Sequence, residues 1–264
     1  MSKLRHVLFA LSMPAVLWGC GPEDLPSELS EPTAAVVMED ASATTAGQEQ
    51  ELTATGEYTW SQGKVATPLG ATTGQACFLT RVGGDFEGGG ERVDIYASGG
   101  SWYLSGASAQ SGIHGASRCA PAVDGYSVQY EWTQASSYPT YMGTATGRVC
   151  FLTGLAGKLN GGGEWVHAYV EGGSWYLSGN TNQTSLRARA RCINVDSYEN
   201  EVAWNQGNSA ALLGAVTNRS CALTYVKGKF EGSGEYVRTF QSNGYWYLGG
   251  NSSQVSVSGR SRCF

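Results

Sequence analysis

GGSWYLSG, residues 99–106, occurs again letter for letter at residues 172–179, and residues 243–250 read NGYWYLGG. The match extends well beyond the octapeptide, because each copy reads roughly WxQ…CxLT…GxGE…WYLxG…Q…RC with a period near 72 residues. Self-similarity at a fixed period is typical of a repeat architecture. The sequence therefore predicts three repeats, at residues 57–122, 123–194 and 195–264.

The octapeptide belongs to a predicted β-hairpin. Residues 91–98, ERVDIYAS, alternate polar and apolar side chains, Gly99 and Gly100 can form a tight turn, and SWYLSG returns along the first strand. With 37 glycines and only 15% charged residues, the composition favours strands and turns over helices. We expect an all-β fold with four or five strands per repeat.

Two arrangements of the repeats fit the sequence. The repeats could form three small domains in a row, or a single body with approximate three-fold symmetry. Only 11 or 12 residues separate the closing cysteine of one repeat from the first tryptophan of the next. We therefore expect neighbouring repeats to touch in either arrangement.

The repeats carry six cysteines, two per repeat and always 42 positions apart: Cys77 and Cys119, Cys150 and Cys192, Cys221 and Cys263. One disulfide per repeat is the simplest interpretation, although six cysteines allow about 15 connectivities. Such a bridge should stabilise a repeat by about 4 kcal/mol by restricting the unfolded chain. The spacing lacks the CxxC pattern of zinc modules, so we expect no metal. Disulfides indicate an oxidising compartment.

Residues 1–20, MSKLRHVLFALSMPAVLWGC, combine two positive charges with an apolar segment too short to span a bilayer. The end, Leu17-Trp18-Gly19-Cys20, resembles the lipobox of bacterial lipoproteins, although Trp18 is bulkier than that family usually carries. The resemblance implies a signal peptide at residues 1–19 and a lipid on Cys20. Gly21 in place of aspartate resembles lipoproteins sent to the outer membrane. An ordinary secretory signal with an unrelated cysteine is the alternative.

Residues 20–56 form a predicted disordered tether, because they carry eight acids, no lysine or arginine, and few apolar side chains. Without the signal and tether, the repeats hold 15 basic and 14 acidic residues. No basic stripe is present, so we expect no nucleic-acid partner.

Catalytic motifs are missing from the sequence. No GxSxG, HExxH or phosphate-binding loop occurs, and His114 and His167 occupy non-equivalent positions. The only repeated acid is the glutamate of GxGE, whereas a glycosidase needs two carboxylates. We predict a non-enzymatic protein without a cofactor and keep an enzyme with a site at a repeat junction as the third alternative.

Each repeat carries one glutamate and one arginine at equivalent positions. A buried glutamate paired with arginine would fix strand register, and a ligand pocket is the alternative interpretation. The residues of this predicted polar network are Glu91, Arg118, Glu164, Arg191, Glu235 and Arg262.

Strand alternation places Trp102 and Leu104 on one side and Tyr103 on the other. A tyrosine that points outward beside amide side chains is typical of sugar-recognising surfaces. The predicted ligand-binding residues are Tyr103, Tyr176 and Tyr247, with Gln110, Gln183 and Gln254. The sequence thus predicts an exported, membrane-anchored module for extracellular or cell-surface glycan. A structural envelope component or a protein-interaction module is the alternative.

Overall fold

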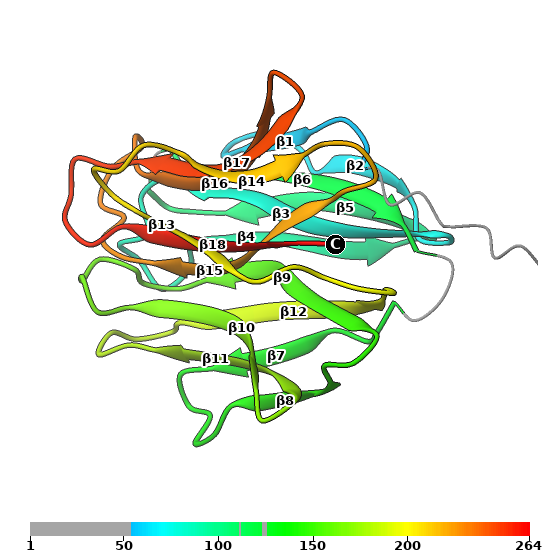
Figure 1. The fold of residues 1–264 in the computed structure, drawn as a ribbon. Helices are drawn as coiled ribbons and strands as arrows, with labels where there is room; N and C mark the ends of the chain where they lie inside the picture. The colour runs from blue at the N-terminus through cyan, green and yellow to red at the C-terminus, as the bar shows by residue number, and fades with distance from the viewer. Residues whose placement is uncertain (1–53, 111, 123–125) are drawn as a thin grey trace, which may run out of the picture. The chain divides into compact units, whose positions relative to one another are not determined.

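The computed structural model describes residues 54–264, except residue 111 and residues 123–125. The signal peptide, Cys20 and nearly all of the predicted tether lie outside this range. The described residues form part of one compact unit and contain eighteen strands and no helix, which confirms the all-β prediction (Figure 1).

Each repeat contributes six strands, so the expected four or five was too few. The missed strands are short segments at the start of each repeat that show little polar–apolar alternation. Repeat 1 holds β1 (Tyr58–Ser61), β2 (Thr67–Ala71), β3 (Gln75–Gly83), β4 (Arg92–Ser98), β5 (Ser101–Ala107) and β6 (His114–Pro121). Repeat 2 holds β7 (Tyr130–Thr133), β8 (Thr140–Thr144), β9 (Arg148–Ala156), β10 (Trp165–Glu171), β11 (Ser174–Asn180) and β12 (Arg187–Asn194). Repeat 3 holds β13 (Val202–Asn205), β14 (Ala211–Ala215), β15 (Cys221–Lys227), β16 (Tyr236–Ser242), β17 (Tyr245–Asn251) and β18 (Ser258–Cys263).

The strands form three six-stranded sheets, and every sheet is shared between two repeats (Figure 1). Sheet A has the order β1-β6-β3-β16-β17-β14 and joins repeats 1 and 3. Sheet B, β2-β5-β4-β9-β12-β7, joins repeats 1 and 2, and sheet C, β13-β18-β15-β10-β11-β8, joins repeats 3 and 2. Equivalent strands make the three junctions: β3 with β16, β9 with β4, and β15 with β10. The repeats therefore form a single body with approximate three-fold symmetry, not three domains in a row.

Backbone hydrogen bonds also close a ring among the three repeats. The amide of Phe86 donates to the carbonyl of Phe230 (2.9 Å), that of Phe230 to Leu159 (2.7 Å), and that of Leu159 to Phe86 (2.9 Å). These three residues occupy equivalent positions and are fully buried. Each buried amide thus finds its acceptor in another repeat, and the ring closes only when all three repeats are in place.

A second buried aromatic cluster joins the repeats. The ring centroids of Phe78, Phe151 and Phe264 lie 5.4 to 5.8 Å apart. Phe78 and Phe151 are equivalent, but repeat 3 has Ala222 at that position. The last residue of the chain, Phe264, supplies the third ring instead, and its backbone pairs with Ser220 (2.9 Å).

The disulfides confirm the prediction of one bridge per repeat. Cys77–Cys119, Cys150–Cys192 and Cys221–Cys263 are bonded. Each bridge joins directly opposite residues, on β3 and β6 or on the equivalent strand pair. Swapped pairing between repeats is thereby excluded.

The octapeptide forms the hairpin that its sequence predicts. Gly99 and Gly100 have φ angles of 56° and 77°, the left-handed pair that a tight two-residue hairpin turn requires. Trp102 and Leu104 are buried, while Tyr103 is half-buried. The final glycine, Gly106, lies under the ring of Trp60, where a β-carbon would collide with the indole. The same Trp–Gly contact recurs in the other two repeats, which explains why both residues are repeated.

Replacing Phe264 with alanine should lower the free energy of unfolding by about 3 kcal/mol, because it leaves a cavity beside Phe78 and Phe151. Adding Ala222→Phe should recover part of that loss, since it restores the ring at the position where repeats 1 and 2 carry it. Urea unfolding followed by tryptophan fluorescence measures both effects. Unchanged stability in Phe264→Ala would contradict the role given to the C-terminal ring.

Candidate binding faces

The three sheets present equivalent outer faces, each with an aromatic pair near the repeated hairpin. Tyr96 faces Tyr103 across β4 and β5, with ring centroids 5.6 Å apart. The corresponding pairs are Tyr169 and Tyr176 (5.9 Å) and Phe240 and Tyr247 (5.6 Å). All six rings are half-buried, so each pair keeps part of its surface open to solvent. Tyr103, Tyr176 and Tyr247 therefore lie on the outer side of their strands.

On sheet C the aromatic pair is part of a longer row. Neighbouring ring centroids lie 5.0 to 6.1 Å apart along this row, which crosses β8, β11, β10 and β15. Its members, in spatial order, are Tyr141, Tyr176, Tyr169, His167, Tyr225 and Trp165. Tyr141 at one end is 55% exposed, which leaves it free to meet a ligand.

A charged cluster adjoins that row and links repeats 2 and 3. The carboxylate of Glu201 lies 3.0 Å from both His167 Nε2 and Arg260 Nη1, and accepts the hydroxyl of Thr224 at 2.6 Å. Burial by itself would raise the pKa of Glu201. The hydrogen bonds and charge of His167 and the hydrogen bonds of Thr224 and Arg260 outweigh burial and lower this pKa to about 2.

Sheet B has a polar recess of about 390 Å³ on the same side as its aromatic pair. Asp94, 6% exposed, lies in it and pairs with Arg92 and Arg189, both at 3.3 Å. Arg189 also pairs with Glu131 at 2.9 Å. Burial raises the pKa of Asp94 despite the opposing charge of the two arginines. The residues that line the recess include three arginines (Arg187 is the third) and one acid, so ion pairing offsets only part of their positive charge.

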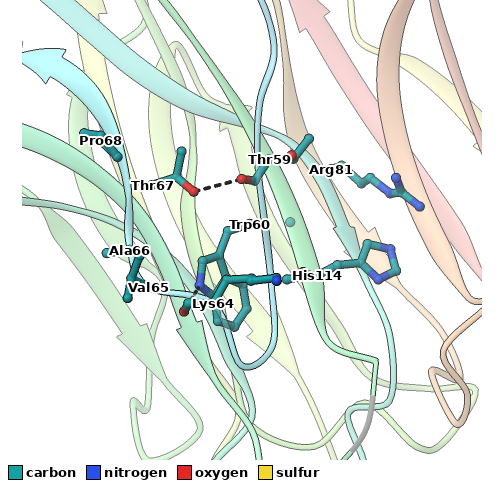
Figure 2. Close-up of a pocket in the computed structure, with 11 residues that line it drawn as sticks. Thr59, Trp60, Lys64, Val65, Ala66, Thr67, Pro68, Arg81 and His114 are labelled. Carbon is teal, nitrogen blue, oxygen red and sulfur yellow. Dashed lines mark hydrogen bonds between the residues drawn. The ribbon is translucent and has the colours of Figure 1, made fainter.

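Sheet A borders a cleft of about 600 Å³ between its edge strand β1 and the neighbouring β2 (Figure 2). The hydroxyl of Thr67 donates to the carbonyl of Thr59 (2.8 Å), and Trp60 donates to the carbonyl of Lys64 (3.0 Å), so both walls are fixed. Lys64 and Arg81 supply positive charge, whereas burial lowers the pKa of His114, and no acidic residue is among the residues that line the cleft. We call this the basic cleft.

The predicted glutamines do not lie beside the predicted tyrosines. Gln110 is three residues beyond the end of β5. There its backbone N–H donates to the hydroxyl of Ser108 (2.8 Å). The equivalent glutamines, Gln183 and Gln254, make the same turn contact with Thr181 and Ser252. Tyr103 to Ala107 alone spans about 13 Å of extended strand. The glutamines therefore belong to the loops, not to the aromatic faces.

The predicted Glu–Arg network takes a different form. Glu91, Glu164 and Glu235 are buried, at 1 to 3% exposure, each beside a glycine of its own GxGE turn. Their backbone carbonyls accept amides from another repeat, such as Gly157 to Glu91 at 2.9 Å. Among the described residues none of these acids forms an ion pair with the repeated arginines.

The arginines stack on tryptophans of the adjacent repeat instead. Arg118 lies 5.1 Å from the ring centroid of Trp246, Arg191 lies 5.0 Å from Trp102, and Arg262 lies 5.3 Å from Trp175. Each guanidinium also donates to a backbone carbonyl, which for Arg118 is that of Thr55 (2.6 Å). The arginine side chains and the backbone carbonyls of the glutamates thus join neighbouring repeats through separate contacts.

The sequence analysis missed the charged residues beside the aromatic pairs. Asp94, His167 and Arg238 occupy one equivalent position, two residues before the outer aromatic residue on β4, β10 and β16. Strand alternation could have placed them on the outer face. A search for identical residues among repeats passes over them, because each repeat carries a different side chain there.

No protein-family model and no curated protein matches this chain. Within the described residues, no group of three or more histidine, cysteine or acidic side chains could hold a metal ion. The same residues contain no helix that is long and apolar enough to cross a membrane.

Glu201→Gln should lower the free energy of unfolding by roughly 2 kcal/mol at pH 6, because the lowered pKa means that the ionised form stabilises the fold. That contribution is complete above the unfolded value of 4.5 and is lost as the pH falls towards 2. The difference between variant and parent should therefore disappear near pH 2. Urea titrations at several pH values measure it, with the exposed acid in Glu171→Gln as control. A gap that persists unchanged at low pH would contradict this account.

Proposed function

We propose that this chain is an exported, lipid-anchored module of the bacterial cell envelope that binds glycans without transforming them. The observation that carries the proposal is the aromatic pair on each outer face. A tyrosine ring offers a flat apolar surface with a polar tip, which suits the mixed apolar and hydroxyl faces of a sugar. The pairs recur in all three repeats, although the charged residues beside them differ.

The architecture supports multivalent binding. Three separated faces on one rigid body can engage one polymer or several chains together, so weak individual sites gain avidity. The faces are also chemically distinct, with an aromatic row on sheet C, a recess of paired arginines and Asp94 on sheet B and the basic cleft beside sheet A. We infer that the faces share sugar stacking and differ in the sugar that each prefers.

The proposed location rests on two independent features of the chain. Three disulfides fit an oxidising, exported environment. The N-terminal segment ends in the lipobox-like Leu17-Trp18-Gly19-Cys20. The outer membrane is the proposed destination, because Gly21 and not aspartate follows the cysteine.

An enzyme, the third alternative, is favoured by one observation, the buried Asp94 with its raised pKa and the nearby Glu131. The charge of Arg189, which pairs with both carboxylates, opposes the raised pKa of Asp94 and weakens Asp94 as a proton donor. Release of reducing sugar ends during incubation with bound glycan would favour the enzyme.

Binding should depend on the outer tyrosines. In a glycan array with residues 21–264, combined Tyr103→Ala, Tyr176→Ala and Tyr247→Ala should weaken binding at least about tenfold, because stacking surface is lost. The matched triple variant with phenylalanine keeps the rings and should retain most of the affinity. Circular dichroism checks that both variants fold. Absence of binding to every glycan would instead favour a structural or protein-interaction role.

Membrane attachment should depend on Cys20. Replacing it with serine in cells that express the full chain should move the protein from the membrane fraction to a soluble exported fraction, because the lipid attachment site is lost. Immunoblots of fractionated cells measure the distribution. Replacing Ser2 with cysteine in the same variant serves as control, since a cysteine outside the lipobox should not restore attachment. An unchanged membrane fraction in Cys20→Ser would contradict the anchor.

A further inference from the structure

Two arginines from different repeats oppose each other on the outer face of sheet A. Arg81 on β3 lies directly opposite Arg238 on β16 in the register of the sheet. Arg81 lies 4.4 Å and Arg238 5.4 Å from the ring centroid of Tyr236, so both guanidinium groups share one aromatic ring. Like charges directly across two strands destabilise a sheet unless another group compensates.

The outer faces of sheets B and C each carry a carboxylate near the equivalent position. On sheet B the position equivalent to Arg238 is Asp94, which pairs with Arg189. On sheet C that position is His167, and Glu201 binds both this histidine and Arg260. Each of these faces therefore carries a carboxylate of the chain at the junction between repeats.

Sheet A has no such carboxylate in contact with the two arginines. Among the described residues neither Arg81 nor Arg238 forms an ion pair, and Arg81 Nε is buried without a hydrogen-bond partner. The acid equivalent to Glu201 is Glu57, which accepts the hydroxyl of Thr80 at 3.0 Å. Burial, followed by the charge of Arg238, lowers the pKa of Arg81, and the smaller effect of the charge on Glu57 opposes this shift. The local environment thus favours an added negative charge.

The arginine pair is continuous with the basic cleft on one side and an aromatic pair on the other. Arg81 also lines the cleft, together with Lys64 and His114 (Figure 2). Arg238 lies 4.3 Å from the ring centroid of Phe240, which stacks on Tyr247. A run of side chains therefore leads from the cleft across β3 to the aromatic pair on β16 and β17.

We propose that the basic cleft and the Arg81–Arg238 pair bind the oxyanion of an acidic polysaccharide, a carboxylate or sulfate, while a neighbouring sugar of the same chain stacks on Phe240 and Tyr247. The ligand oxyanion would balance the charge of the arginine pair, as Asp94 and Glu201 balance arginines on the other two faces. Arginine suits this role because its planar guanidinium donates two parallel hydrogen bonds to such groups. This inference rests on the proposed glycan-binding function and names the ligand class of one face.

Isothermal titration of residues 21–264 with polygalacturonate, dextran sulfate and neutral dextran tests the proposal. At least one acidic polymer should bind, more weakly as sodium chloride increases, and should bind at least about tenfold more weakly to Arg81→Gln and to Arg238→Gln. The two acidic polymers distinguish carboxylate from sulfate. Lys229→Gln removes the same charge from a surface pair with Glu231 and should leave binding unchanged.

The melting temperature of each variant distinguishes ligand binding from a purely structural role of the two arginines. Since each substitution removes a like-charge contact, the melting temperature should stay within about 2 °C of the parent or increase. Acidic polymers that bind the parent and both arginine variants equally would overturn the proposal, as would a failure of both to bind. If, in that case, neutral glycans on the array still bind the parent and lose binding in the triple Tyr→Ala variant, the proposed glycan binding stands and only this inference fails. If no glycan binds at all, the proposed function fails with it.

Discussion

Backbone pairing between neighbouring repeats is the constraint on which the rest of this structure depends. Each repeat supplies three strands to one sheet and three to another, so no repeat completes a sheet by itself. The open edges of β3, β4 and β9 find partners only in other repeats. Unpaired central edges would leave buried amides and carbonyls without partners, which is costly. The ring of hydrogen bonds through Phe86, Leu159 and Phe230 applies the same requirement at the centre.

This shared construction explains most of the residues that recur in every repeat. Arg118, Arg191 and Arg262 stack on a tryptophan of the adjacent repeat, and the buried glutamates accept amides across the same junctions. In each repeat the first tryptophan packs against a glycine on a strand of the other sheet that the repeat supplies, as Trp60 does against Gly106. Repetition therefore reports mainly on the assembly of the fold, because every junction needs the same contacts.

The three outer faces differ at positions that the repeats do not share. The outer faces keep an aromatic pair in common, but Asp94, His167 and Arg238 give the three junctions different charges. On two faces a carboxylate of the chain balances the local arginine, and on the third it does not. The repeats thus serve as internal controls for one another, since the same backbone position can be compared in three chemical settings.

The sequence by itself determined the repeats, the β class and the hairpin with its glycine turn, and it favoured one disulfide per repeat, which the structure then selected over swapped pairing. These features follow from local periodicity and from residue types that permit few alternatives, such as Gly99 and Gly100 at positive φ. It also placed Tyr103 outward, because strand alternation is a local property. Only the tertiary structure decided that sheets are shared, that Gln110 lies away from Tyr103, and that Arg118 meets Trp246 instead of Glu91. Those contacts join residues of different strands and repeats, and their spacing along the chain carries no information about which partner lies opposite. The ring of Phe264 at the position left by Ala222 is the clearest case, since packing at the centre is satisfied by whichever side chain can reach it.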